Sequence, residues 1–369
     1  MSTFFPDEEQ LMVMDLARKM AVNEVGPVAE DTDHNAYIHT EVLSTIAESG
    51  LICCMLPEEF GGDGLDYWNQ ICVIEEIAKE CASTAWAVAN TAEAAMAVLK
   101  YGTDALKAKV LPAFANAVLA CVAGNDSPHF GRQEITLRAS KEADGYVLNG
   151  IKKNVPVINE VQKFLVSATA DDGVKWFLAD RNTPGLTICE DAPLLGMKGC
   201  RNGNVIFDSC KMDKDTLLKG DASEYISSIQ NLNIAAIAAG ISEGAVTIAV
   251  DYVNQRVQFG KRIAEFENTQ VVLARLRART EASKALLWSA AETDPDDKEF
   301  SNIAAIAKLE TTDTACITTR KCLQLMGGYG YSREYPIERK MRDAKMTEIL
   351  AVDTIGLERE IAADFVVKN

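Results

Sequence analysis

Two stretches of the C-terminal half decide the fold: RVQFGKRI at Arg256–Ile263 and CLQLMGGYGYSREYPIERKMRDAKMTEIL at Cys322–Leu350. In the first, Arg256 closes a long apolar helical pattern and precedes a Phe-Gly pair by three residues. In the second, Gln324 comes shortly before the paired glycines Gly327 and Gly328. An arginine can pair with a pyrophosphate, and a glycine pair lets the backbone approach a ligand closely. The two stretches therefore predict a phosphate-bearing ligand at the ends of helices.

Composition and charge are those of a folded globular protein. A chain of 369 residues is long enough for two or three domains, and 48% hydrophobic with 25% charged residues argues against a disordered chain. The formal net charge of -17 disfavours binding to nucleic-acid phosphates or to an anionic membrane surface. We therefore expect neither nucleic acid nor a membrane as a partner.

The remaining compositional signals concern compartment and metals. The N-terminal MSTFFPDEEQ is acidic where a signal peptide is basic, and no uninterrupted apolar run approaches the roughly 20 residues of a membrane span, so we expect a cytoplasmic protein. The ten cysteines are scattered without a CxxC pair, which predicts reduced thiols in the core. The three histidines have no zinc-like spacing with cysteine, so we expect no metal.

Hydrophobic periodicity divides the chain into three parts. Helical spacing runs from residue 7 to about 101, with Leu11, Met14, Ala17 and Ala21 expected on one face. Alternation of period two follows, with Ile135, Leu137 and Ala139 in a strand and a hairpin around Asp171-Asp172-Gly173. Helical spacing returns near 223, with Ile241, Ala245, Ile248 and Tyr252 on one stripe. This order predicts an α+β fold with a helical domain at 1–120, a β-domain at 121–220 and a helical bundle at 221–369.

With three further segments, the two stretches quoted above resemble the acyl-CoA dehydrogenase family over essentially the whole chain. These segments are PEEFGGDGLD at 57–66, LGMKG at 195–199 and VIFDSCKMDKDTLLKG at 205–220. The resemblance implies an N-terminal helical domain, a middle β-domain and a C-terminal four-helix bundle, assembled as a dimer of dimers with FAD at the subunit interface. It also implies which residues contact FAD: Arg256 and Phe259 in the neighbouring subunit's site, and Gln324, Gly327 and Gly328 around the ADP portion, with Gln270 as a further candidate. The alternative is that Arg256 pairs with Asp251 or Glu265, and that the glycines only end a helix.

The residues expected around the flavin ring depart from the family pattern. Where family members place Thr/Ser-Glu-Pro and Gly-Ser-Asp, this chain has AGNDSPHFGR at 123–132, with Asn125 as the closest replacement. The family's Trp-Ile-Thr is replaced by Asn154, Val155 and Pro156, and proline lacks both a hydroxyl and an N–H donor. The polar candidates for holding the ring are therefore Asn125, Asp126 and Asn154.

The catalytic base of the family is also absent from its expected place. An ungapped reading puts Ala351, Val352 and Asp353 at the positions of the Glu-Gly-Thr that carries it. The second family location for the base, on the helix leading to Arg256, falls at about Gln230, which cannot accept a proton at neutral pH. The family's Asp-x-x-Arg for the CoA chain falls on Ser228 and Asn231.

Two other carboxylates are candidates for the base, because α,β-dehydrogenation requires one to take the α-proton. Asp353 lies two residues past the expected site, and Glu93 lies on a helix that by resemblance lines the acyl pocket. The alternatives are that Asp353 caps the C-terminal helix and that Glu93 faces solvent.

The predicted function is that of an acyl-CoA dehydrogenase-like flavoprotein that acts on an acyl-CoA thioester with FAD and a non-standard base. Alternatives are a non-catalytic subunit of a heteromeric acyl-CoA dehydrogenase, a flavin monooxygenase of the same fold, and a flavin-poor scaffold. The resemblance also implies electron-transferring flavoprotein as a partner, and a homotetramer or a heterotetramer with a paralogous subunit.

Overall fold

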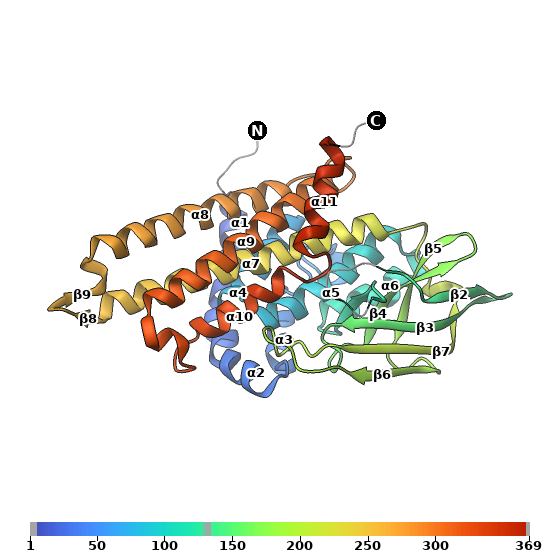
Figure 1. Ribbon diagram of the computed structural model, residues 1–369. Coiled ribbons are helices and arrows are strands. Elements are labelled where there is room, and N and C mark those ends of the chain that lie inside the picture. Colours follow the sequence, from blue (N-terminus) through green and yellow to red (C-terminus); the bar gives the residue numbers. More distant parts are fainter. Residues whose placement is uncertain (1–5, 128, 130–133, 367–369) are drawn as a thin grey trace.

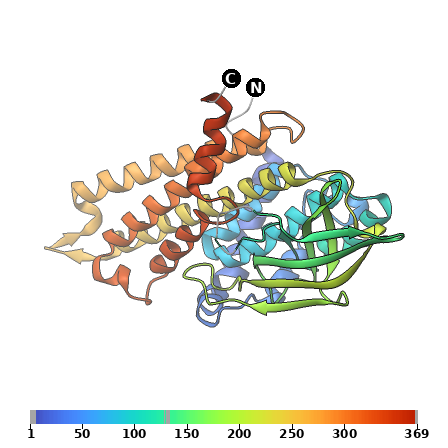
Figure 2. The same cartoon turned by 45° about the vertical axis from the view of Figure 1, so that its right-hand side comes forward.

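The computed structural model describes residues 6–127, 129 and 134–366, and the chain forms three parts in the predicted order. The β-sheet lies at one end of the molecule, the long C-terminal helices extend away from it, and the N-terminal helices pack beside both (Figure 1). Turning the view brings the strands forward and shows the same separation of sheet and bundle (Figure 2). The α+β architecture that the sequence predicts is confirmed.

The N-terminal part is helical. Its α-helices are α1 (Glu8–Met20), α2 (Ala29–Asn35), α3 (Thr40–Glu48), α4 (Tyr67–Glu80), α5 (Ala82–Tyr101) and α6 (Asp104–Ala115). The predicted face of α1 is partly wrong, because Met14, Ala17 and Ala21 are buried whereas Leu11 is 52% exposed. At 3.6 residues per turn Leu11 lies about 120° around α1 from the buried Ala17, outside the buried stripe.

The middle part is a seven-stranded sheet formed by residues 120–213. Its strands are β1 (Ala120–Ala123), β2 (Arg138–Lys141), β3 (Gly145–Val155), β4 (Lys163–Ala170), β5 (Gly173–Asp180), β6 (Leu186–Glu190) and β7 (Gly203–Asp213). The strand order is β1-β4-β2-β3-β7-β6, and β5 pairs with β4 in the predicted hairpin. The boundary predicted at 120/121 falls inside β1.

The start of β2 differs from the prediction. Ile135 and Leu137 precede the strand, which begins at Arg138. The physical reason is that the backbone N–H groups of Thr136 and Leu137 donate to the carboxylate of Asp126. Because this carboxylate takes those donors, the chain is held toward the Asp126 loop instead of joining the strand ladder at that point.

The C-terminal part is a bundle of long helices. Its elements are α7 (Ser223–Gln255), a short hairpin of β8 (Val257–Gln258) and β9 (Lys261–Arg262), α8 (Glu267–Ala291), α9 (Phe300–Leu325), α10 (Ile337–Thr347) and α11 (Thr354–Phe365). The stripe predicted on α7 is confirmed, since Ile241 and Ala245 are buried and Ile248 and Tyr252 pack partly buried against the core. Helix α7 is long and apolar enough to cross a membrane, but 78% of its most apolar window is buried inside the protein, as in a core helix.

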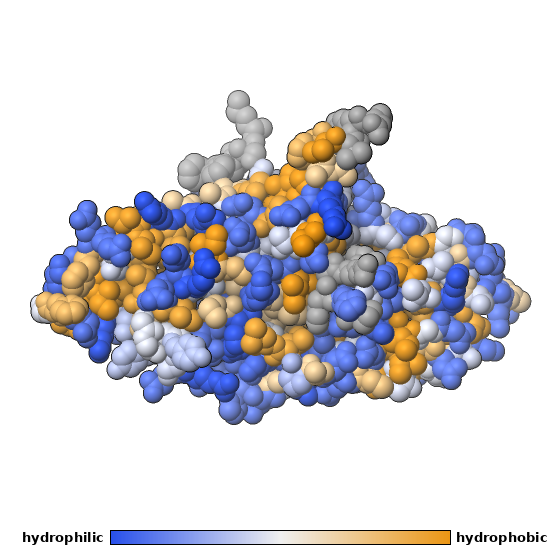
Figure 3. All heavy atoms as spheres, in the orientation of Figure 1, coloured by the Kyte–Doolittle hydropathy of each residue, from blue (hydrophilic) through white to orange (hydrophobic). Residues whose placement is uncertain are grey.

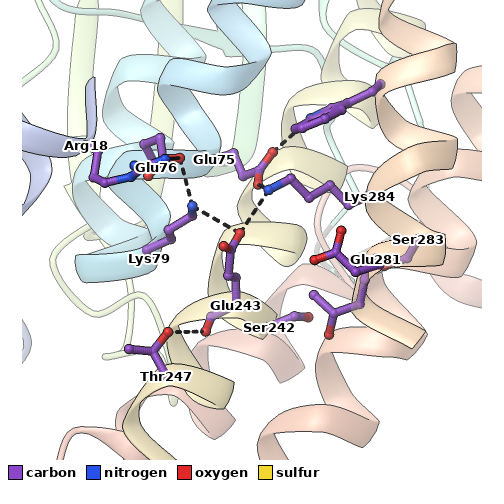
Figure 4. Close-up of polar contacts among 12 residues, drawn as sticks. Arg18, Glu75, Glu76, Lys79, Ser242, Glu243, Thr247, Glu281, Ser283 and Lys284 are labelled. Carbon is purple, nitrogen blue, oxygen red and sulfur yellow. Dashed lines mark hydrogen bonds and ion pairs between the residues drawn. The ribbon is translucent and has the colours of Figure 1, made fainter. Parts of the chain in front are cut away.

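A buried network of charges joins the N-terminal helices to the bundle (Figure 4). Lys284 of α8 lies 2.7 Å from Glu75 of α4 and 3.0 Å from Glu243 of α7, and Lys79 of α4 lies 3.0 Å from Glu243. Burial alone would raise the pKa of Glu243, but the two lysines outweigh it and lower that pKa to about 2. The network therefore fixes the relative position of three helices, because removing one member would leave an uncompensated buried charge.

Candidate functional site

A cavity of about 130 Å³ opens where the three parts of the chain meet. Each part supplies some of its walls: Trp86 from α5, Trp176 from β5, Gln230 from α7 and Ala351 from the loop before α11. Further lining residues are Val122, Ala123, Gly124, Asn125, Ile135, Lys153, Asn154, Val155, Pro156, Ser223, Ile226, Ser227 and Leu350. The cavity therefore unites the predicted ring-site residues with the expected position of the base.

The two tryptophans of this cavity, Trp86 and Trp176, are not predicted by any sequence motif. The indole N–H of Trp176 donates to the Ser223 hydroxyl at 3.0 Å, which ties the sheet to the start of α7. A Cβ at Gly124 would lie 3.2 Å from the Trp176 ring, so only a glycine fits there without displacing that ring. No local pattern marks Trp86 or Trp176, because they meet only when the helices and the sheet pack together.

Asn125 organises the loop that follows β1. Its side-chain oxygen accepts from the backbone N–H groups of Ser127, at 3.1 Å, and of Glu134, at 2.9 Å. Its carbonyl accepts from the N–H of Lys153 on β3, at 3.1 Å. The predicted ring-site residue thus lies at the cavity wall, and its side-chain oxygen is already bonded to the loop. Pro128 and residues 130–132 of the quoted stretch lie outside the described residues.

Asp126, the next residue, faces inward and forms a buried ion pair. Its carboxylate lies 2.5 Å from the ammonium nitrogen of Lys152, and that nitrogen lies 2.8 Å from the Ser167 hydroxyl. Burial lowers the pKa of Lys152 to about 8 although the charge of Asp126 opposes this shift. Asp126 therefore supports the loop from behind and does not line the cavity.

Asn154 lines the cavity in a left-handed backbone conformation with φ of 54°. Asparagine tolerates this conformation better than most residues do. Its side-chain amide donates to the carbonyl of Ser127 at 3.1 Å. Asn154 therefore closes the loop against β3, and one of its two amide donors is already taken.

The segment at the expected base position is held by a buried lysine. Leu350 and Ala351 line the cavity, and Ala351 has a left-handed φ of 57°. The ammonium nitrogen of Lys308 on α9 donates to the carbonyls of Leu350 and Val352, both at 2.6 Å. Asp353 lies at the N-cap of α11 and accepts from the N–H of Gly356 at 2.7 Å. The Asp353 carboxylate is thus placed as the capping alternative expects.

Glu93, the other candidate base, is buried, so the alternative that it faces solvent is wrong. Its side chain projects from α5 into the protein interior and lies beside Gln230 of α7. Burial raises the pKa of the Glu93 carboxyl well above the usual range, although the Gln230 side chain opposes this shift. Burial therefore favours the neutral, protonated form of the Glu93 carboxyl. Of the two candidate bases, neither is among the described residues that line the cavity.

The positions aligned with the CoA-binding pair are buried. Ser228 and Asn231 lie inside α7, and the Ser228 hydroxyl donates to the carbonyl of Glu224 at 2.8 Å. Gln230, between them, lines the cavity. The side-chain amide of Gln230 therefore lines the cavity, whereas the Ser228 side chain is buried in the protein interior.

A second candidate site lies at the far end of the bundle, where the predicted ADP-site residues meet. Arg256, Gly327 and Gly328 line one groove of about 490 Å³ together with Tyr329. The Arg256 guanidinium lies 5.2 Å from the centre of the Tyr329 ring, and no acidic side chain among the described residues forms an ion pair with it. A Cβ at Gly327 or Gly328 would meet open space, so packing in this chain leaves room beside both glycines.

The other predicted cofactor residues of the bundle, Gln324, Gln270 and Phe259, are not among the described residues that line this groove. Gln324 is exposed on α9, and Gln270 on α8 donates from its amide to the carbonyl of Ala264 at 3.0 Å. Phe259, at the tip of the β8–β9 hairpin, is 94% exposed with φ of 53°. Apolar surface gathers over this end of the molecule (Figure 3).

The cavity and the groove are separated by the length of α7. Ser223, the first residue of this helix, lines the cavity, and Arg256 follows its last residue. A helix of 33 residues is about 50 Å long. One dinucleotide is too short to reach both, so the two sites of a single chain cannot hold the same molecule.

Comparisons with known proteins agree with this architecture. The chain matches the N-terminal, middle and C-terminal domains of acyl-CoA dehydrogenase over residues 7–117, 127–210 and 228–363. It is 33% identical over 356 residues to the cyclohex-1-ene-1-carbonyl-CoA dehydrogenase of Syntrophus aciditrophicus (strain SB), covering 93% of this chain and 86% of that protein. It is 31% identical over 355 residues to the acryloyl-CoA reductase (NADH) of Anaerotignum propionicum, covering 92% and 90%.

A solved structure gives the same result. The butyryl-CoA dehydrogenase of Megasphaera elsdenii superimposes with a TM-score of 0.93 at 28% identity, covering 99% of this chain and 100% of that one. The resemblance predicted from the sequence is therefore confirmed across all three parts. The chain belongs to the acyl-CoA dehydrogenase family.

Proposed function

We propose that this protein is an FAD-dependent oxidoreductase that acts on the Cα–Cβ bond of an acyl-CoA thioester. The observation that carries the proposal is the cavity at the junction of the three domains, where Trp86, Trp176 and the 350–351 segment enclose a space of about 130 Å³. Relatives that match nearly the whole chain are named for acyl-CoA chemistry, which favours an enzyme over a non-catalytic subunit or a scaffold.

FAD fits the residues of both sites if each molecule is shared between two copies of the chain. Arg256 is exposed, free of acidic partners among the described residues, and suited to a pyrophosphate, and Gly327 and Gly328 leave room for close approach. Because the cavity and the groove lie about a helix length apart, the groove of one copy would serve the cofactor in the cavity of another. We accordingly infer a homo-oligomer, with a tetramer as the family arrangement.

FAD, when bound, supplies hydride transfer to and from the Cβ of the thioester. The residues of this chain exclude water with two indole rings and hold the loop after β1 through Asn125 and Asp126. Ala351 can neither take nor return the α-proton. Asp353 and Glu93 remain the proposed alternatives, and Asp353 is the better suited, because burial disfavours the ionised form of Glu93 and a base must be ionised.

The remaining proposals concern partners and compartment. Electron-transferring flavoprotein is the redox partner that the family resemblance implies, and the cytoplasm is the compartment that the composition favours. Mixing reduced protein with a purified electron-transferring flavoprotein and following flavin reoxidation tests the partner directly.

The test of the proposed function is a spectroscopic titration of the purified chain. The protein should carry a yellow flavin chromophore, alone or after incubation with FAD, and acyl-CoA should perturb its visible spectrum. Free CoA serves as the control for binding through the nucleotide portion alone. Protein that takes up no FAD and binds no acyl-CoA would rule the proposal out.

A further inference from the structure

A buried lysine of β3 lies behind the cavity. The side chain of Lys152 is 0% exposed, and Lys152 is not among the described residues that line the cavity. Its ammonium nitrogen lies 2.5 Å from the Asp126 carboxylate, 2.8 Å from the Ser167 hydroxyl on β4 and 3.4 Å from the carbonyl oxygen of Gly124. These three acceptors match the three N–H donors of an ammonium group. Lys152 therefore joins two strands and the loop after β1 through one charged group.

Gly124 connects this lysine to the wall of the cavity. Gly124 lines the cavity, and its carbonyl accepts from both Lys152 and the Ser167 hydroxyl, the latter at 2.8 Å. Ser167 is the cross-strand partner of Trp176 on β5, so their side chains lie on the same face of the sheet. A Cβ at Gly124 would lie 3.2 Å from the Trp176 ring. The backbone that Lys152 holds is thus the backbone against which Trp176 packs, and we call Gly124, Asn125 and Trp176 the ring-side wall.

The Asp126 carboxylate extends the network to the segment before β2. It accepts from the backbone N–H groups of Thr136 and Leu137, and from the Thr136 hydroxyl at 3.0 Å. Ile135, the residue before them, lines the cavity. Without the cation of Lys152, this carboxylate would be an uncompensated charge in the interior. The lysine therefore holds the chain on both sides of the loop.

We propose that Lys152 is a positioning residue for the flavin: its ammonium group sets the place of the Gly124 backbone and of the Trp176 ring, and so the shape of the ring-side wall. The inference rests on the proposed function, because it assigns the flavin ring to this cavity. Lys152 acts only through its three acceptors. A lysine that merely stabilised the fold would change the melting temperature and leave the retention of FAD unchanged.

The proton of Lys152 gives this role a pH dependence. Burial lowers the pKa of Lys152 to about 8, although the charge of Asp126 opposes this shift. Asp126 is the one charged group among the described residues that acts on this ammonium. Below this pKa the group has three donors for its three acceptors, whereas the neutral amine has two donors and leaves the carboxylate without a cation. FAD should therefore be held less tightly at pH 9 than at pH 7.

The test measures how fast FAD-loaded protein releases its flavin after dilution, followed by flavin fluorescence at pH 7 and pH 9. At pH 7 we expect Lys152→Met to release FAD roughly tenfold faster than wild type, the effect of losing about one charge-assisted hydrogen bond. The visible spectrum of the bound flavin should also shift. The increase in release rate between pH 7 and pH 9 should be present in wild type and absent from Lys152→Met. Equal release rates of the two proteins at both pH values would overturn the inference.

Lys340 provides a matched control. It is buried, its ammonium nitrogen bonds to three carbonyls at the end of α4, and burial lowers its pKa to about 8. Lys340 is not among the described residues that line the cavity. Lys340→Met should therefore destabilise the fold while it keeps the wild-type release rate and its pH dependence. Release from Lys340→Met as fast as from Lys152→Met would refute a role specific to Lys152.

Ser167→Ala decides the question if Lys152→Met does not fold. This change removes one acceptor of Lys152 and one donor to the Gly124 carbonyl, and it keeps the ion pair with Asp126. We expect flavin release to become severalfold faster, and release at the wild-type rate would overturn the inference. Wild type that takes up FAD but shows no effect of these changes contradicts this inference alone, whereas wild type that takes up no FAD contradicts the proposed function as well.

Discussion

The ammonium nitrogen of Lys308 lies 2.6 Å from the carbonyl oxygen of Leu350, and at the same distance from that of Val352. These carbonyls flank Ala351, which occupies the expected position of the base and lines the cavity. Lys308 therefore fixes the backbone of the segment on which the family chemistry depends, although the side chain at 351 is only a methyl group.

Lys308→Met should loosen this segment. The change leaves two carbonyls without their donor, so we expect a loss of about 1–3 kcal/mol in the free energy of unfolding. Hydrogen exchange in the 348–356 backbone should become faster.

Lys340 offers the control for Lys308, because its ammonium nitrogen bonds to the carbonyls of Ala78, Lys79 and Glu80 at the end of α4. Lys340→Met should leave exchange at 348–356 unchanged. Unaltered exchange there in Lys308→Met would contradict the role assigned to Lys308.

The same lysine predicts a pH dependence of stability. Burial lowers the pKa of Lys308 to about 7 from an ordinary 10.5, although Glu360 and Asp353 oppose the shift. Between these values the unfolded chain binds the proton that the folded chain has released, so the stabilisation of wild type relative to Lys308→Met should increase with pH. The neutral amine keeps two N–H donors for its two carbonyls. Chemical denaturation of both proteins at pH 7 and pH 9 measures this difference, and a difference that falls with pH would refute the argument.

Arg256→Ala should lower the FAD content of the purified protein. The substitution removes a charge-assisted contact to the pyrophosphate, worth about 1.5–3 kcal/mol. Absorbance of released flavin per chain measures the loss. Arg277→Ala is the control, since Arg277 pairs with Glu281 on the surface of α8. Equal flavin content in wild type and Arg256→Ala would reject the groove as part of the FAD site.

Restoring a carboxylate at position 351 tests what the cavity still lacks. Wild type should be reduced slowly by butyryl-CoA under anaerobic conditions, because Ala351 cannot remove the α-proton. Ala351→Glu should accelerate flavin reduction by at least the lower part of the 10²- to 10⁴-fold range of general-base catalysis. Fast reduction of wild type that is lost in Asp353→Asn would identify Asp353 as the base. Fast reduction that survives both Asp353→Asn and Glu93→Gln would exclude both candidates.

Ala245→Asp should destabilise the bundle strongly. Ala245 is buried on α7 within a cluster that includes Leu276, Cys322 and Met326. A carboxylate there would lack a cation, and an uncompensated buried charge costs roughly 3–5 kcal/mol. Thr247→Asp, on the exposed side of the same helix, should be nearly neutral. Thermal melts of both proteins compare them directly, and equal melting temperatures would mean that the register of α7 is wrong.

The sequence by itself determined the order of the three domains and the buried stripe of α7, and the family resemblance implied that Arg256, Gly327 and Gly328 serve one kind of cofactor. Periodicity suffices for the first two, because a helix or strand must bury a face whose spacing is visible locally. The prediction for Leu11 was wrong because this residue lies outside the buried stripe of α1. The predicted start of β2 was wrong because the Asp126 carboxylate accepts hydrogen bonds from the backbone just before the strand.

Only the tertiary structure decided how the cavity is built and what its residues can do. Trp86, Trp176, Gln230 and Ala351 come from four distant segments, and no spacing along the chain brings them together. The same holds for Lys308, whose carbonyl partners lie more than forty positions away, and for Glu93, whose protonation depends on burial. The sequence shows which polar and ionisable side chains are present. The packing of helices against the sheet sets their solvation and their neighbours, and these determine their chemistry.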